Sequence, residues 1–483
     1  MSSRSALKRV PAEFSPSYEL VLFVAGSLLL IVPCFWQSRL QISDLESHIY
    51  NAWLAQLIEN GSAPGLAIVS QKTNVLFDWL LSALFRAWGP GPAQKISAAL
   101  CVLIFAWGAF AFIARLSGRR PWHLMPIVGV LAWGWTLHMG FMNFYLSLGL
   151  CLWAMTLAWT PHARSLAPPL VLAAVLAHAL PVLWAIALMT YAWFWGRPNL
   201  IRRQYLLGGV LLAMFLCVAA LRSLVPTLWL RHQMMNILGA DQAMVFGSWY
   251  EFVLLGLLFS CAALLFQFIR QSGLTKAFWS LPFQLWLLTV ILVLVVPTRV
   301  SIPGYQNALM YISDRMSLAV GVCLCALLSA VPAHAFVRYG IAALALLFFG
   351  FLYHDERVLN DIEDRVQAVV WTLPLNSRVI NGIEEPNLRV YPLTHMLDRI
   401  CVGRCYSYAN YEPSTGQFRI RVTAENPILA PSYDDSVHLQ LGGYVVKDRD
   451  APLYQVRLNP AGNIEVRELP PGTTTTLTYL HPL

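Results

Sequence analysis

The chain has 483 residues, of which 57% are hydrophobic and 12% are charged, and its formal net charge is +8. This composition excludes a disordered or fibrous protein and a single water-soluble domain. Several apolar stretches reach the roughly 20 residues that a helix needs to cross a ~30 Å hydrocarbon layer. The basic residues stand in short loops between these stretches, which indicates membrane topology rather than a nucleic-acid partner.

The fold that we expect is mostly α: a polytopic transmembrane bundle of about 11 crossings over residues 1–353, followed by a soluble extracytoplasmic α+β domain over residues 354–483. Arg4, Lys8 and Arg9 place the N-terminus in the cytoplasm by the positive-inside rule. The first crossing then leads into a long outer loop, residues 37–92. The expected crossings are residues 19–36, 95–114, 122–138, 141–159, two short helices in 166–195, 205–222, 249–269, 279–298, 316–331 and 338–353.

The stretch 166–195 fits either one tilted helix or two short helices split between His178 and Pro181. A single helix would leave the arginine-rich segment 197–203 outside. Two short helices return that segment to the cytoplasm, so we expect two.

The C-terminal region is polar. Residues 355–373 have apolar positions at helical spacing, which predicts an amphipathic helix just beyond the last crossing. Residues 418–423 alternate like a half-buried strand, and residues 456–466 read as a hairpin. Cys401 and Cys405 lie outside the membrane, where their spacing allows a disulfide, with two free thiols as the alternative.

The most informative segment begins the long outer loop and contains Asp44, Glu46 and His48. Ser43 and Glu46 fit a capping box that opens an amphipathic helix, so capping is the alternative role for Glu46. A surface position on that helix is the alternative for His48. Asp44 at the head of the helix would stay ionised through the helix dipole, which suits a general base or a metal ligand.

This layout resembles the GT-C superfamily of glycosyltransferases: an inner N-terminus, one crossing, an Asp-x-Glu segment opening a long outer loop, about ten more crossings and an outer C-terminal domain. The resemblance implies an enzyme that takes sugar from a polyprenyl-phosphate carrier and passes it to an extracytoplasmic glycan, lipid or protein. It also implies that Asp44 is catalytic, with Glu46 as the second candidate. A divalent cation, Mg²⁺ or Mn²⁺, held by Asp44 or Glu46 can bridge to the phosphate, but the reaction does not require one.

Cationic and polar residues on the same face are candidates for substrate binding. Arg315 stands at an outer helix start, where a planar guanidinium suits a lipid-linked phosphate, and an ion pair with Asp314 is the alternative. His138 and Asn143 flank a turn at this face, and a hydrogen-bonded structural role is the alternative for His138. The remaining candidates for substrate binding are His48, Arg299, Tyr305 and Arg231.

Three classes of function are therefore compared. The first is an inverting glycosyltransferase of a bacterial cell membrane, with Asp44 as general base. A transporter or flippase of a lipid-linked saccharide should show paired interrupted helices and charges at mid-depth, whereas the sequence has one such break and charges at the outer rim. The third is a non-catalytic membrane scaffold whose outer domain binds partners.

Overall fold

The apolar stretches of the sequence form a bundle of helices in the computed structural model, which describes residues 15–198 and 200–480. The basic residues Arg4, Lys8 and Arg9 lie outside the described residues. The main helices of the bundle are α1 (Pro16–Ile31), α4 (Pro90–Ser117), α5 (Met125–Ala132), α6 (Trp135–His138), α7 (Met142–Ala158), α8 (Ala167–Ala177), α9 (Ala179–Trp195), α10 (Arg203–Leu224), α11 (Tyr250–Ser272), α12 (Leu274–Phe278), α13 (Leu281–Val295), α14 (Ile312–Leu328) and α15 (Ala335–Val370).

Five segments of the described chain are helical, long enough and apolar enough to cross a membrane. They are Pro16–Cys34, Pro90–Ser117, Arg203–Leu224, Tyr250–Ser272 and Ala335–Val370. This is compatible with a multi-pass membrane protein. The count of about 11 crossings stays a prediction, because further apolar helices such as α7 and α9 have 17 residues each. The expected helix over 122–138 is interrupted: α5 ends at Ala132 and α6 restarts at Trp135.

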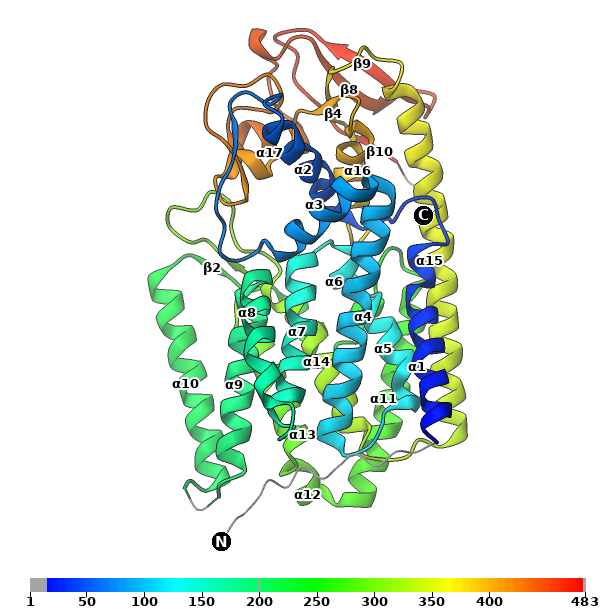
Figure 1. Ribbon diagram of the computed structural model, residues 1–483, viewed down its shortest axis with the longest axis vertical. Coiled ribbons are helices and arrows are strands. Elements are labelled where there is room, and N and C mark those ends of the chain that lie inside the picture. Colours follow the sequence, from blue (N-terminus) through cyan, green and yellow to red (C-terminus); the bar gives the residue numbers. More distant parts are fainter. Residues whose placement is uncertain (1–14, 199, 481–483) are drawn as a thin grey trace.

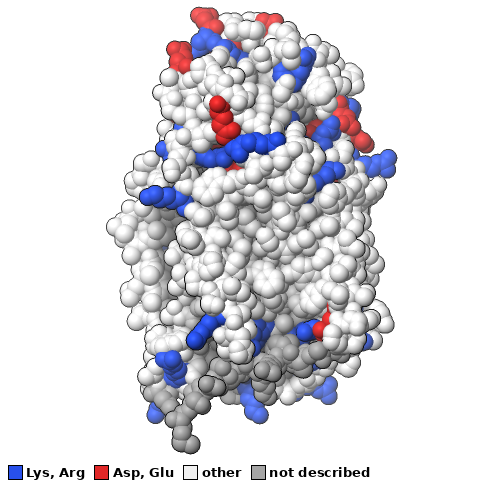
Figure 2. Space-filling view, viewed as in Figure 1, with Lys and Arg blue, Asp and Glu red and all other residues white. Residues whose placement is uncertain are grey.

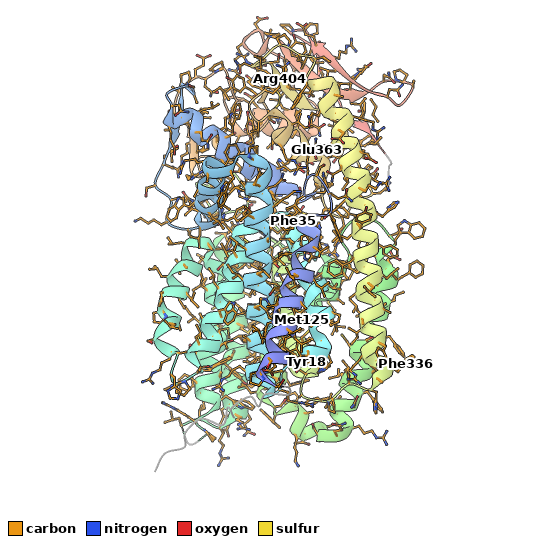
Figure 3. All side chains as sticks on the ribbon, turned by 45° about the vertical axis from the view of Figure 1, so that its right-hand side comes forward. Tyr18, Phe35, Met125, Phe336, Glu363 and Arg404 are labelled. Atoms are coloured by element: carbon orange, nitrogen blue, oxygen red, sulfur yellow. A yellow bond between two sulfur atoms is a disulfide. The ribbon has the colours of Figure 1, made fainter. Side chains whose placement is uncertain are left out.

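Charged side chains gather at the two ends of the molecule. On the face shown in Figure 2 they lie in the upper part and near the lower end, with an uncharged band between them. Arg120 lies at the lower end, where it pairs with Glu19 at the start of α1. Tyr18 and Phe336 lie toward this end, and Glu363 lies toward the opposite end (Figure 3).

The expected break within residues 166–195 is confirmed. His178 is extended between α8 and α9, and its Nδ1 accepts a hydrogen bond from the backbone N–H of Leu180 at 3.2 Å. The break lies beside the long loop after α1, because the N–H of Val75 donates to the carbonyl of Leu176 at 3.1 Å. The two short helices therefore turn at the end of the bundle where the long loop lies.

A layer of short helices and strands covers this end of the bundle (Figure 1). We call it the cap; it comprises residues 37–89 and 371–480. Its elements are α2 (Ser43–Glu59), β1 (Leu66–Ile68), α3 (Leu76–Trp88), β4 (Arg378–Asn381), β5 (Ile383–Glu384), α16 (Pro392–Cys401), β6 (Tyr406–Ser407), β7 (Ile420–Val422), α17 (Tyr433–Leu441), β8 (Leu453–Leu458), β9 (Ile464–Leu469) and β10 (Thr478–Tyr479).

The strands of the cap are short and belong to several sheets. The largest sheet has the order β6-β4-β8-β9, with β4 parallel to both β6 and β8. β8 and β9 are antiparallel, which confirms the predicted hairpin. β10 pairs with β5, and β2 (Thr227–Leu228) pairs with β3 (Arg299–Val300) in a loop region between bundle and cap.

Short 3₁₀ helices fill several connections. They are η1 (Val32–Cys34), η2 (Trp122–Leu124), η3 (Arg164–Leu166), η4 (Arg231–Leu238), η5 (Ala240–Ala243), η6 (Glu412–Thr415) and η7 (Asp448–Asp450).

The C-terminal region and the long loop pack together in the cap. β7, the strand predicted over 418–423, pairs antiparallel with β1 from the long loop, so that Ile68 lies opposite Ile420. α16 packs on α2. The amphipathic helix predicted over 355–373 is the second half of α15, and the expected boundary after residue 353 therefore falls inside one continuous helix.

Cys401 and Cys405 form a disulfide at the end of α16. Arg404, the residue before Cys405, lies in the cap (Figure 3), where it donates to the carbonyls of Trp371 and Leu373. The disulfide therefore lies in the cap and closes the end of α16, one of the helices that contribute residues to the site described below.

Candidate functional site

Asp44 lies at the start of α2, where the cap meets the bundle. Its backbone N–H donates to the carbonyl of Met139 at 3.4 Å, so the turn between α6 and α7 holds the first turn of α2. Gly140 makes this approach possible: its φ is +80°, and a Cβ there would lie 2.4 Å from the Asp44 nitrogen. The Asp44 side chain is 27% exposed and so remains accessible.

The predicted capping box is wrong. The N-cap residue of α2 is Ile42, and no side chain caps the helix. Ser43 is already helical, and its hydroxyl donates to the carbonyl of Tyr391 at 2.9 Å. The carboxylate of Glu46 points to an arginine from α16 instead of returning to the start of its own helix.

Glu46 belongs to a buried ion-pair network. Arg399 Nη2 lies 2.9 Å from Glu46 Oε1, and Arg399 Nε donates to Glu363 Oε1 at 2.8 Å. Both acids are fully buried. Burial raises the pKa of Glu46, although the charge of Arg399 opposes the shift. This geometry gives Glu46 a structural role, and the expected second catalytic acid is not available to a substrate.

The same geometry does not fit a divalent ion shared by Asp44 and Glu46, because Glu46 is enclosed with Arg399. Within residues 15–198 and 200–480, no group of three or more His, Cys, Asp or Glu side chains is placed to hold a metal.

His48 lies one helical turn after Asp44 and pairs with Asp78 of α3. His48 Nδ1 is 2.8 Å from Asp78 Oδ1, and Asn143 Nδ2 donates to Asp78 Oδ2 at 2.9 Å. Burial alone would lower the pKa of His48, but the charge and hydrogen bond of Asp78 raise it to about 9. His48 is therefore a cation at neutral pH, and Asn143 acts on the site by orienting Asp78.

Arg315 lies near Asp44 and has no hydrogen-bonded partner for its guanidinium among the residues that the structure describes. The guanidinium stacks 3.6 Å from the ring centroid of Phe141, and its buried Nε donates to no acceptor. Asp44, Tyr411 and Tyr311 lie close enough to interact with it electrostatically. Among the described residues the alternative ion pair of Arg315 with Asp314 is not found, and Asp314 Oδ1 instead lies 2.9 Å from His232 Nε2.

The other predicted substrate contacts lie elsewhere. His138 is fully buried, with Nδ1 3.2 Å from the carbonyl of Gly134 and Nε2 3.5 Å from Glu356, which supports its structural alternative. Arg299, Tyr305 and Arg231 are exposed in the loops between bundle and cap. In the described part of the chain no hydrogen bond or ion pair connects these three residues to Asp44.

The C-terminal region contributes site residues that the sequence interpretation missed. His395 Nε2 of α16 lies 3.5 Å from Asp44 Oδ1, and its Nδ1 lies 2.9 Å from Asp398 Oδ2. Glu412 accepts a hydrogen bond from Ser47 at 3.0 Å, and burial raises its pKa to about 7. The spacing of His395 and Asp398, three residues apart on a helix, is a sequence signal for such a pair.

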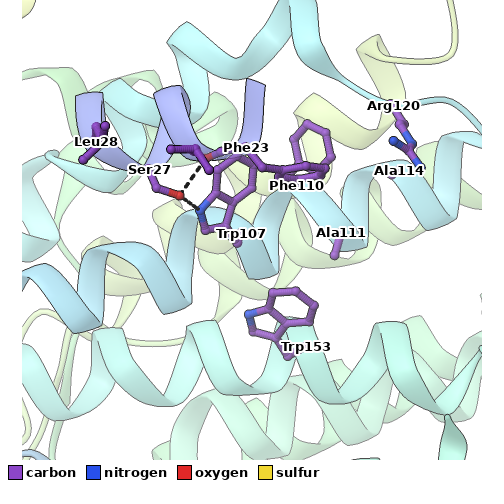
Figure 4. Close-up of a pocket in the computed structure, with 10 residues that line it drawn as sticks. Phe23, Ser27, Leu28, Trp107, Phe110, Ala111, Ala114, Arg120 and Trp153 are labelled. Atoms are coloured by element: carbon purple, nitrogen blue, oxygen red, sulfur yellow. Dashed lines mark hydrogen bonds between the residues drawn. The ribbon is translucent and has the colours of Figure 1, made fainter. Parts of the chain in front are cut away.

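An apolar groove of about 630 Å³ lies on the side of the bundle between α1 and α4 (Figure 4). Phe23, Trp107, Phe110 and Trp153 line it, and Trp107 Nε1 donates to Ser27 Oγ at 3.0 Å. Its charged residue, Arg120, is paired with Glu19. The groove therefore offers apolar surface and no reactive group.

No protein-family model, no curated protein and no solved structure matches the chain. The site can thus be interpreted from its own chemistry: an accessible carboxylate, two histidines that each pair with an aspartate, and an arginine that has no anionic partner within hydrogen-bonding distance among the described residues.

Proposed function

We propose that the chain is an integral membrane glycosyltransferase that moves a sugar from a polyprenyl-phosphate donor to an acceptor hydroxyl on a glycan, lipid or protein. The observation that carries the proposal is the accessible carboxylate of Asp44 within electrostatic range of the Arg315 guanidinium, which has no hydrogen-bonded partner among the described residues. A transferase of this type needs a base for the acceptor and a cation for the departing phosphate. The resemblance of the layout to GT-C enzymes supports the same assignment.

In this mechanism Asp44 removes the proton of the acceptor hydroxyl as the acceptor oxygen bonds to the anomeric carbon. The bond from that carbon to the phosphate oxygen breaks, and its electron pair leaves with the polyprenyl phosphate. Arg315 stabilises the charge that develops on this phosphate, since a guanidinium matches phosphate geometry bidentately. Attack opposite to the leaving group inverts the anomeric configuration.

Donor binding tests the role of Arg315. Arg315→Lys keeps the charge but loses the planar fork, so we expect weaker binding of a polyprenyl-phosphate sugar to the purified protein. Arg315→Ala should weaken binding more, by about 1.5–3 kcal/mol, as expected for a lost charge-assisted hydrogen bond. Equilibrium binding of a radiolabelled donor in detergent measures both changes.

The matched control is Arg86→Ala, which removes an exposed arginine of the cap whose partner is Glu59. It should bind the donor as the parent does. If both Arg315 variants bind the donor as the parent does, Arg315 does not bind the phosphate and serves only as an interfacial anchor.

We also propose that the cap faces away from the cytoplasm of a bacterial cell. Cysteines introduced at the exposed positions Ser62 and Glu425 of the cap should react with an impermeant thiol reagent in intact cells. Cysteines at the other end should be shielded until the membrane is opened, at Arg202 directly before α10 and at Thr275 in the short helix α12. The reverse pattern would place the site on the cytoplasmic side, where a polyprenyl-phosphate donor of the outer leaflet cannot reach it.

A further inference from the structure

Two residues of α16 connect to Asp44 through successive contacts: Asp398 contacts His395, and His395 contacts Asp44. Asp398 Oδ2 lies 2.9 Å from His395 Nδ1, and His395 Nε2 lies 3.5 Å from Asp44 Oδ1. The His395 side chain is 7% exposed and that of Asp398 is 4% exposed. The imidazole is thus enclosed between two acids, of which only Asp44 is accessible.

Asp398, the residue of this series farthest from Asp44, is held by further hydrogen bonds. The Ser407 hydroxyl donates to Asp398 Oδ1, and Asn410 Nδ2 lies 3.4 Å from Asp398 Oδ2. A carboxylate held in this way fixes which imidazole nitrogen faces it, and therefore which nitrogen faces the other side. His395 Nε2 is consequently directed to Asp44 and not free to rotate away.

We propose that His395, held by Asp398, is a positioning residue that places a positive charge against Oδ1 of Asp44 and so orients this carboxylate for its work as a base. The proposal rests on the function proposed above. The imidazolium faces Oδ1 of Asp44, and this leaves the second carboxylate oxygen for the acceptor hydroxyl. No hydrogen bond to that second oxygen is found among the described residues.

The electrostatics around the pair support this role. Burial alone would lower the pKa of His395, but the hydrogen bond and charge of Asp398, with the charges of Asp44 and Glu46, raise it to about 9. His395 is thus positively charged throughout the neutral range. A cation at this distance favours the ionised form of a carboxylate.

Asp44 also faces other ionisable groups, which enter any pH dependence. They come from three elements and the residues that directly precede two of them: His48 of α2, Arg315 of α14 with Tyr311 before it, and Glu412 of η6 with Tyr411 before it. Besides the acids named above, His395 faces the ring of Tyr411, at a centroid separation of 6.0 Å. Removing His395 leaves these other groups in place, so its own effect can be isolated.

The experiment is an infrared pH titration of the Asp44 carboxyl in detergent-purified protein. The difference spectrum between the parent and Asp44→Asn assigns the band. In His395→Gln we expect Asp44 to take up its proton at a pH at least one unit higher than in the parent. Asp398→Asn keeps the imidazole of His395 but removes the carboxylate that holds it. This variant should shift the titration of Asp44 in the same direction by a smaller amount.

The control is His438→Gln, which removes an exposed histidine of α17 that contacts the carbonyl of Asp434. It should leave the titration unchanged. Because the two test variants differ in the group removed, a folding failure of one still leaves the other to decide. An Asp44 titration that is the same in the parent and in the folded variants overturns the inference.

A second measurement separates this inference from the proposed function. With a labelled donor, the acid side of the pH profile for transfer should move upward in His395→Gln, whereas a merely structural residue would lower transfer equally at every pH. Absence of transfer by the parent with every polyprenyl-phosphate sugar would reject the proposed function, and the infrared shift would still decide whether His395 controls the ionisation of Asp44.

Discussion

Asp44→Asn is expected to lower sugar transfer at least about a hundredfold, the lower end of what general-base catalysis supplies. The substitution preserves size, and the backbone N–H that bonds to Met139 is retained, so the fold should be nearly unaffected. Asn cannot accept the acceptor's proton. Transfer from a labelled polyprenyl-phosphate sugar, measured with purified protein in liposomes, checks this prediction.

Glu59→Gln is the matched control, because Glu59 is an exposed acid on the same helix and pairs with Arg86. It should transfer sugar as the parent does. Full activity in monodisperse Asp44→Asn protein would remove Asp44 from the mechanism. A parent that moves a lipid-linked sugar across a bilayer but never transfers it would favour the transporter.

Arg399→Met is expected to destabilise the protein by about 3–5 kcal/mol, the usual loss when one partner of a buried ion pair is removed. Arg399 is the nearest cation to Glu46, which is fully buried, and it also contacts Glu363. Without Arg399, the carboxylate of Glu46 would stay buried in the cap with neither oxygen paired to this cation. Its Oε2 already has no hydrogen-bond partner among the described residues. Chemical unfolding in detergent, followed by Trp fluorescence, measures the change.

Two further variants sharpen this test. Arg449→Met removes an exposed arginine paired with Asp435 and should change stability by less than about 1 kcal/mol. Adding Glu46→Gln to Arg399→Met should recover part of the loss, because one uncompensated charge is then removed. If Arg399→Met unfolds as the parent does, the network is not a major source of stability.

The sequence was most informative where the constraint is local. The split at His178 could be predicted because Pro181 and the basic segment 197–203 both disfavour one long helix, and the structure has two helices there. The hairpin of β8 and β9 followed from alternation around a turn. The length of α15 did not follow, because a change from apolar to amphipathic sequence marks the surface of a bundle and not the end of a helix.

The site itself could be predicted only in part. Asp44 and Arg315 were singled out by their positions at helix starts on one face, and in the structure the two side chains lie within electrostatic range of each other. The capping box failed because tertiary partners, Tyr391 for Ser43 and Arg399 for Glu46, replaced the local ones. His395 was missed because about 350 residues separate it from Asp44, and no local pattern reports such a contact.

The pairing of β1 with β7 has a consequence for biosynthesis. Leu66 emerges from the ribosome early, but its partner Val422 is made more than 350 residues later. At about 5–20 residues per second, the first loop waits on the order of tens of seconds for its partner strand. Until then Asp44 also lacks His395, so a nascent or truncated chain can contain the helical bundle without a complete site.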